Sequence, residues 1–163
     1  MIKQIIESKS VEIHFQPIVS IRTKKIYAFE ALTRCTYMEN FIPPNELFEL
    51  AKKEDLIIEL DELTRTMAIE KFKEYHLKNN DLVLFLNFES TMINKYEENN
   101  NRNSFVKKIN SLKIPSKNFV LEVKEDEITN TKALKKFCST YKEMGFSIAL
   151  DDFGTGSSTF DRI

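Results

Sequence analysis

Short runs of apolar positions, rich in β-branched and aromatic residues, recur along this chain and are typical of strands. Five such runs are present: Val11–Val19, Lys25–Leu32, Leu82–Phe88, Asn118–Val123 and Ser147–Asp151. Only a short turn around Arg22–Lys24 separates the first two runs, so we expect those two strands to pair antiparallel.

Apolar residues at helical spacing fill the intervals between the later runs. The expected helices are Pro44–Lys53, Ile58–Leu77, Asn103–Leu112 and Thr131–Met144. Gly145 follows the last of them at a position that favours a helix end. Alternation of strand and helix implies parallel strands joined by helical crossovers, which is an α/β fold.

The 163 residues are enough for one domain with its own core. We find no internal repeat and no linker, and therefore expect one domain over residues 1–163. The asparagine-rich stretch Asn94–Ser104 is interpreted as a solvated loop before a helix.

Charge is nearly balanced, with 24 Lys and Arg against 25 Asp and Glu. This balance argues against binding polymeric nucleic acid through a basic face. The two cysteines, Cys35 and Cys138, lack metal-site spacing and are expected to be reduced thiols. No apolar run is long enough for a bilayer, so a cytoplasmic setting is expected. Attachment to a membrane protein through another region stays open.

Acids and an amide stand near the ends of four successive strands after the first. They are Glu30, Asn87, Glu122 and the pair Asp151 and Asp152. In a barrel, the C-terminal ends of parallel strands meet at one mouth, where active sites lie. These side chains would then converge there.

Converging carboxylates repel one another unless a cation neutralises them. Carboxylate and amide oxygens are hard ligands that suit Mg²⁺, Mn²⁺ or Ca²⁺, and neither His14 nor His76 falls in this set. The alternative is that each acid is a helix N-cap or a solvated loop residue.

Several motifs occur in an order and spacing that resemble the EAL domain family. They are Phe15–Val19, Phe29–Arg34, Ile57–Asp61, Leu86–Phe88, Leu121–Glu125 and Ile148–Gly156. The second contains the three letters that name the family, and the last is its most specific signature. Together they span nearly all of the chain.

The resemblance implies a (β/α)8 TIM-type barrel whose first strand runs antiparallel, with about five strands present here. It implies a phosphodiesterase that hydrolyses the bacterial messenger cyclic di-GMP to linear pGpG with Mg²⁺ or Mn²⁺. By motif, the metal ligands would be Glu30, Asn87, Glu122, Asp151 and Asp152. Of these, Glu30, Asp151 and Asp152 would be catalytic. Gln16 and Arg34 would contact the ligand.

The chain also departs from the family pattern. It ends at Ile163, before the family's later strands with their Lys, acidic ligand and Gln, and Lys124 replaces a Thr. We expect this chain to be a portion of a longer protein, and we expect the 163-residue chain to be inactive by itself. The alternatives are a short product that pairs with another chain, as in a homodimer, and a degenerate EAL domain that senses cyclic di-GMP or docks a partner. An attached sensor or cyclase domain is a further alternative.

Overall fold

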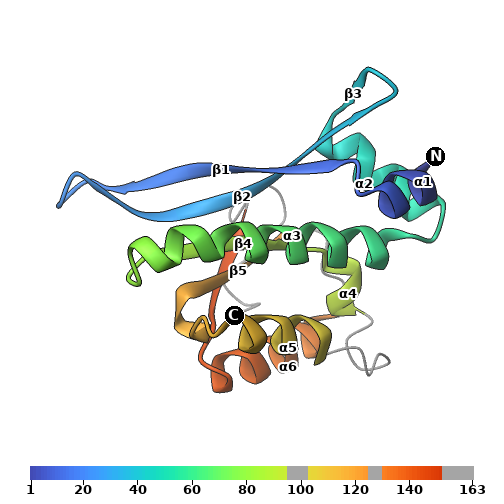
Figure 1. Cartoon of the computed structure of the whole chain (residues 1–163). Helices are drawn as coiled ribbons and strands as arrows, with labels where there is room; N and C mark the ends of the chain where they lie inside the picture. The colour runs from blue at the N-terminus through green and yellow to red at the C-terminus, as the bar shows by residue number, and fades with distance from the viewer. Residues whose placement is uncertain (95–102, 125–129, 152–163) are drawn as a thin grey trace. The chain divides into compact units, whose positions relative to one another are not determined.

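The structure, a computed structural model, describes residues 1–94, 103–124 and 130–151 (Figure 1). Contacts divide the chain into two compact units, Met1–Leu82 and Val83–Ile163, here named the N-terminal unit and the C-terminal unit. Within the described ranges, no helix is both long and apolar enough to cross a membrane.

A long antiparallel hairpin forms the sheet of the N-terminal unit. Strands β1 (Val11–Ser20) and β2 (Lys25–Tyr37) pair along the whole length of β1, with one register irregularity. Strand β3 (Asn40–Ile42) folds back on the end of β2. The turn between β2 and β3 places two non-glycine residues, Met38 and Glu39, at positive φ, as the tightest hairpin turns require.

Three helices build the core of this unit: α1 (Ile2–Ser8), α2 (Pro44–Lys53) and α3 (Ile57–Lys78). In Figure 1, α3 runs along the hairpin, and it packs on β1. Proline at the first position of α2 suits a helix start, because its missing N–H would have no partner there. The helices and strands bury one apolar cluster: Ile2, Ile5, Val11, Cys35, Ile42, Leu47, Ala51, Ile57 and Leu60.

Helix α3 also buries an ion pair. Arg65 Nη2 lies 2.7 Å from Asp61 Oδ2, one helical turn away, and both side chains are about 5% exposed or less. Charges this deep need a partner to offset the lost hydration. The spacing of four residues brings them to the same helix face.

The C-terminal unit contains three parallel strands: β4 (Val83–Phe88), β5 (Phe119–Lys124) and β6 (Ser147–Asp151). Its other elements are α4 (Ser90–Asn94), α5 (Asn103–Leu112), the short 3-10 helix η1 (Ser116–Asn118) and α6 (Thr131–Glu143). The parallel strands need the intervening helices as crossovers. This order confirms the predicted α/β alternation.

Aromatic rings fill the core of this unit. Phe88 of β4 lies 4.9 Å, centroid to centroid, from Phe137 of α6, which lies 4.7 Å from Tyr141. Phe105 of α5 reaches the same group, 6.2 Å from Tyr141. At the start of α6, the side chain of Asn130 accepts a hydrogen bond from the Ala133 N–H.

Several element bounds differ from the sequence prediction. Strand β2 continues to Tyr37, whereas the apolar run predicted an end at Leu32, because the polar residues Thr33, Arg34 and Thr36 interrupt that run while β1 and β3 still pair with them. Helix α1, strand β3, helix α4 and η1 were not predicted, since each is too short for a periodic pattern. Much of Asn94–Ser104, predicted to be a loop, lies outside the described residues.

Candidate functional site

The two faces of the β1–β2 hairpin have different surroundings. Side chains alternate between faces along a strand. Phe15 and Phe29, on one face, stack with centroids 5.6 Å apart, and both rings meet Tyr75 of α3 at 5.3 and 5.1 Å. Helix α3 therefore covers this face of the hairpin. The opposite face, here named the polar hairpin face, carries Glu12, His14 and Gln16 from β1 and Glu30, Leu32 and Arg34 from β2.

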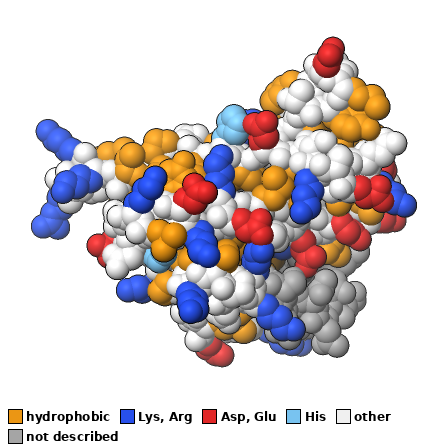
Figure 2. Space-filling model, viewed as in Figure 1, with side chains coloured by type: hydrophobic (Ala, Val, Ile, Leu, Met, Phe, Trp, Pro, Cys, Tyr) orange, Lys and Arg blue, Asp and Glu red, His pale blue; other side chains and the backbone are white. Residues whose placement is uncertain are grey.

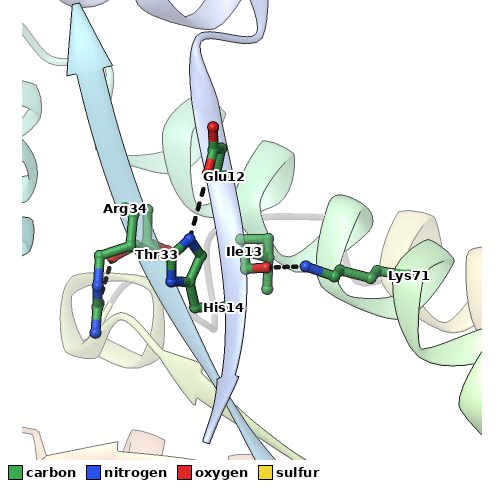
Figure 3. A network of polar contacts seen from close by, with 6 residues as sticks. All are labelled: Glu12, Ile13, His14, Thr33, Arg34 and Lys71. Carbon is green, nitrogen blue, oxygen red and sulfur yellow. Dashed lines mark hydrogen bonds and ion pairs between the residues drawn. The ribbon is translucent and has the colours of Figure 1, made fainter.

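Lys71 fixes the hairpin to α3 from the side away from Arg34 (Figure 3). Its Nζ donates a hydrogen bond to the Ile13 carbonyl and lies 5.5 Å from the centroid of the Phe15 ring. A cation over a ring adds to the packing of the aromatic cluster. The polar hairpin face is thus presented by a strand that is held from its other side.

Two of the predicted site residues lie directly opposite each other on this face. Gln16 and Glu30 are partners in the antiparallel register. Arg34 lies four residues beyond Glu30, and its Nη1 donates to the Thr33 carbonyl at 2.8 Å. Glu30 was expected near the end of its strand, but it lies in the middle of β2, because the strand continues to Tyr37.

The C-terminal unit brings Asn87 and Glu122 together. They are register partners on β4 and β5, and the next strand continues the row with Ala149. The residues before and after them, Leu86 and Phe88 on β4, are buried on the other face. The structure therefore places an amide and a carboxylate side by side, as predicted from the strand ends, on the face opposite the aromatic core.

Asp151 lies one step further along that face, beside a cation. Its partner on β5 is Lys124, two residues after Glu122. Side chains on neighbouring strands at one register position are about 5 Å apart at Cβ. The buried Ser90 donates to the Lys124 carbonyl at 3.5 Å, which ties the end of β5 to the residue that opens α4. The sequence did not predict that Lys124 would stand next to the acid.

The donor set suits a hard cation but is incomplete within the described ranges. In the described part of the chain, no three His, Cys, Asp or Glu side chains gather closely enough to hold a metal ion. Asn87 adds an amide oxygen beside Glu122, and Asp152, a further predicted ligand, lies outside the described residues. Oxygen donors of this kind are those that Mg²⁺, Mn²⁺ and Ca²⁺ select.

Sequence reasoning missed Glu12 and His14 as members of the polar hairpin face. The signal was available, because both precede Gln16 at intervals of two residues, and a strand places such residues on one face. In the structure, Glu12 is the register partner of Arg34, and His14 that of Leu32.

Comparison with known proteins identifies the family of the chain. The family model of the EAL domain matches residues 1–163. The chain belongs to the EAL domain family. Within that family, it is 28% identical over 163 residues to the probable cyclic di-GMP phosphodiesterase PdeB of Escherichia coli strain K12, matching 99% of this chain and 31% of PdeB. The chain spans between 20% and 31% of the length of three curated relatives that it matches.

Solved EAL structures share the fold. The cyclic di-GMP complex of the PaMucR phosphodiesterase matches 98% of this chain and 65% of its own, with a TM-score of 0.84 and 22% identity. The Bacillus subtilis YkuI protein, solved with cyclic di-GMP and calcium, matches 99% of this EAL chain and 41% of its own, with a TM-score of 0.80 and 23% identity. These matches confirm the predicted fold class, a TIM-type barrel of which this chain carries part.

Proposed function

We propose that this chain carries part of the active site of a cyclic di-GMP phosphodiesterase that forms linear pGpG. The observation that carries the proposal is the Asn87–Glu122 pair in parallel register, with Asp151 one step along the same face. This row lies where barrel enzymes place their catalytic groups. Relatives named as cyclic di-GMP phosphodiesterases support the substrate.

The metal ligands in this proposal are Glu30, Asn87, Glu122, Asp151 and Asp152, and the cation is Mg²⁺ or Mn²⁺. Support comes from their oxygen donors, which are hard ligands. A divalent cation bound there would supply a Lewis acid and an activated water for attack on phosphorus. The carboxylates of the chain would hold this cation where the negative charge of the phosphate must be offset.

Gln16 and Arg34 would bind the dinucleotide. The guanidinium of Arg34 has five N–H donors, and Nη1 uses one of them for the Thr33 carbonyl. The planar fork that remains matches two oxygens of a phosphodiester. Gln16 lies opposite Glu30, so a ligand that contacts the amide would lie beside a proposed metal ligand.

Metal binding provides the first test. We expect Mn²⁺ affinity, measured by titration calorimetry, to fall at least tenfold in Asp151→Asn and in Glu122→Gln, because each change removes one charge and keeps the shape. Asp81→Asn, on an exposed turn of the N-terminal unit, is the matched control and should bind as the unchanged chain does. Equal affinity in all four proteins would contradict the metal assignment.

Turnover separates the enzyme from the alternative binding module. Cyclic di-GMP and Mn²⁺ are incubated with a protein that carries the complete EAL domain, and linear product is followed by chromatography. Hydrolysis that is lost in Glu30→Ala supports the phosphodiesterase. Saturable binding of cyclic di-GMP without product, by a protein that carries the complete EAL domain, supports the non-catalytic sensor.

The same proposal covers the setting of the site. We propose that both units belong to one EAL domain over residues 1–163 and that the protein acts in the cytoplasm. A homodimer, and a sensor or cyclase domain elsewhere in a longer protein, are compatible with it.

On the face drawn in Figure 2, Lys and Arg are interspersed with Asp and Glu except at the free end of the hairpin, whose turn carries Arg22 and Lys24. Apart from that turn, the face drawn offers no continuous basic surface for polymeric nucleic acid.

A further inference from the structure

A carboxylate and an imidazole flank the arginine of the polar hairpin face. Glu12 is the register partner of Arg34, so the two side chains start from directly opposite positions on one face. The Glu12 carboxylate nevertheless pairs with its own strand neighbour, with Oε2 3.2 Å from His14 Nε2. Figure 3 shows this contact, and the guanidinium of Arg34 turned back to the Thr33 carbonyl at 2.8 Å.

Glu12 is the carboxylate of the hairpin best placed to reach Arg34. Opposite residues on neighbouring antiparallel strands have Cβ atoms about 5 Å apart, within reach of these two long side chains. Glu30, the other acid on this face, is four residues away along β2, which is roughly 13 Å in a strand. Lys71 of α3 contacts Ile13 and Phe15 from the other side of the hairpin.

A carboxylate binds a guanidinium through the same two-pronged geometry that a phosphodiester uses. If Glu12 turned to Arg34, it would occupy the donors that an anionic ligand needs. Among the described residues, the structure records no ion pair between Glu12 and Arg34, and the carboxylate rests on His14 instead. The Glu12 carboxylate therefore has two partners within reach, His14 and Arg34, and in the structure it pairs with His14.

We propose that His14 is a positioning residue that holds the Glu12 carboxylate away from Arg34, and that Glu12 is a built-in competitor of the anion that Arg34 binds. The inference rests on the proposed function for the role of Arg34 in binding an anion and for the identity of that anion, cyclic di-GMP. Loss of His14 releases Glu12 to Arg34 and weakens anion binding. Loss of Glu12 as well removes the competitor and restores binding.

The first experiment needs no ligand. Arg34 is modified with phenylglyoxal in the 163-residue chain and in His14→Ala, Glu12→Gln and the double variant, and its rate is read by peptide mass spectrometry. We expect His14→Ala to slow the modification of Arg34 about fivefold, the upper range of an exposed ion pair, and the double variant to recover the original rate. Arg22, on the exposed hairpin turn, is the internal reference and should react equally in all four proteins.

Recovery in the double variant also excludes misfolding as the cause, since that protein still lacks His14. An unchanged Arg34 rate in His14→Ala would overturn the inference. Slowing that persists in the double variant would overturn it equally, because it would show an effect that does not pass through Glu12.

The second experiment measures cyclic di-GMP affinity of the same proteins by calorimetry with Ca²⁺ present. A several-fold loss in His14→Ala that the double variant restores supports the inference and the proposed function together. If His14→Ala protects Arg34 but none of the proteins binds cyclic di-GMP, cyclic di-GMP is not the anion that Arg34 binds in this chain, and the inference about Glu12 and His14 stands. If all four proteins bind cyclic di-GMP equally, the inference about Glu12 and His14 is wrong, and the proposed function stands.

Discussion

The two units use different strand geometry to gather their polar side chains. In the N-terminal unit, Gln16 and Glu30 come together because two antiparallel strands fold back on each other, and neither residue lies at a strand end. In the C-terminal unit, Asn87 and Glu122 come together because parallel strands run in register. Polar residues near the ends of parallel strands can therefore be predicted from the sequence to lie together. For an antiparallel hairpin, the register must be known before one can say which residues lie together.

The interiors of the units differ as well. Helix α3 of the N-terminal unit buries the Asp61–Arg65 ion pair, while the C-terminal unit packs Phe88, Phe137 and Tyr141 and begins α6 with a side-chain cap. A buried pair is costly to break because one charge is then left without compensation. A single change that breaks this pair should therefore cost more than one that removes the cap of α6.

The largest expected effect comes from breaking the buried pair. Arg65→Met should lower the free energy of unfolding by about 3–5 kcal/mol, because Asp61 loses its cation in a buried position. Denaturant unfolding followed by circular dichroism measures it, with Arg22→Met on the exposed turn as the control. The double variant Asp61→Leu with Arg65→Met should recover most of the loss. A loss no larger than in the control would contradict the comparison.

The helix cap of the C-terminal unit should have a smaller effect. Asn130→Ala removes the hydrogen bond from the Ala133 N–H, 3.0 Å long, and should cost about 1 kcal/mol of unfolding free energy. The same denaturation measurement applies. Ser139→Ala, exposed in the middle of α6, is the matched control, and equal stability of the two variants would show that the cap contributes nothing.

A change at Lys124 tests whether its position opposite Asp151 on the neighbouring parallel strand affects metal binding. Lys124→Thr removes a cation one strand away from Asp151 and should raise Mn²⁺ affinity about fivefold, the scale of about 1 kcal/mol for charges near a protein surface. Calorimetric titration measures the change, and Lys117→Thr in η1, an exposed position before β5, controls for net charge. If both variants bind equally, the placement of Lys124 beside Asp151 has no bearing on the metal.

The smallest effect concerns the thiols, one in each unit. Burial raises the pKa of Cys35 and of Cys138, and for Cys138 the nearby Lys142 partly offsets that rise. A raised pKa leaves less thiolate at pH 8, so both should react with iodoacetamide more slowly than a free cysteine, and faster as the pH rises past 9. Cys35 is 1% exposed and Cys138 is half-buried, so Cys138 should react first. Peptide mass spectrometry would show the order, and prior labelling of Cys35 would contradict it.

Thiol burial also affects stability with a defined sign. A thiol whose pKa is higher in the folded state keeps its proton when the unfolded chain has lost it. Its effect on stability is absent below the ordinary thiol pKa of 9.0 and becomes unfavourable above that pH. Cys35→Ser should therefore change the pH dependence of unfolding only above about pH 9.

Local chemistry sufficed to predict several elements. Pro44 and the residues after it predicted α2, and the apolar run of Ser147–Asp151 predicted β6. Each pattern lies within a single element, so no contact with another part of the chain was needed to recognise it. For the same reason, the sequence could predict that the polar residues near the ends of β4, β5 and β6 lie in neighbouring register, because a parallel sheet aligns its strand ends. Their role as metal ligands stays a prediction. The EAL motifs were legible in the chain, and the family match over residues 1–163 agrees with them.

Only the tertiary structure decided how β2 continues past Leu32, because its polar second half is held as a strand by pairing with β1 and β3. It alone placed Glu12 opposite Arg34 and Lys124 opposite Asp151, since a register is a property of two strands and of the turn or crossover between them. It also decided that Asp61 and Arg65 are buried, because helical spacing shows that two residues share a face but not which face is covered.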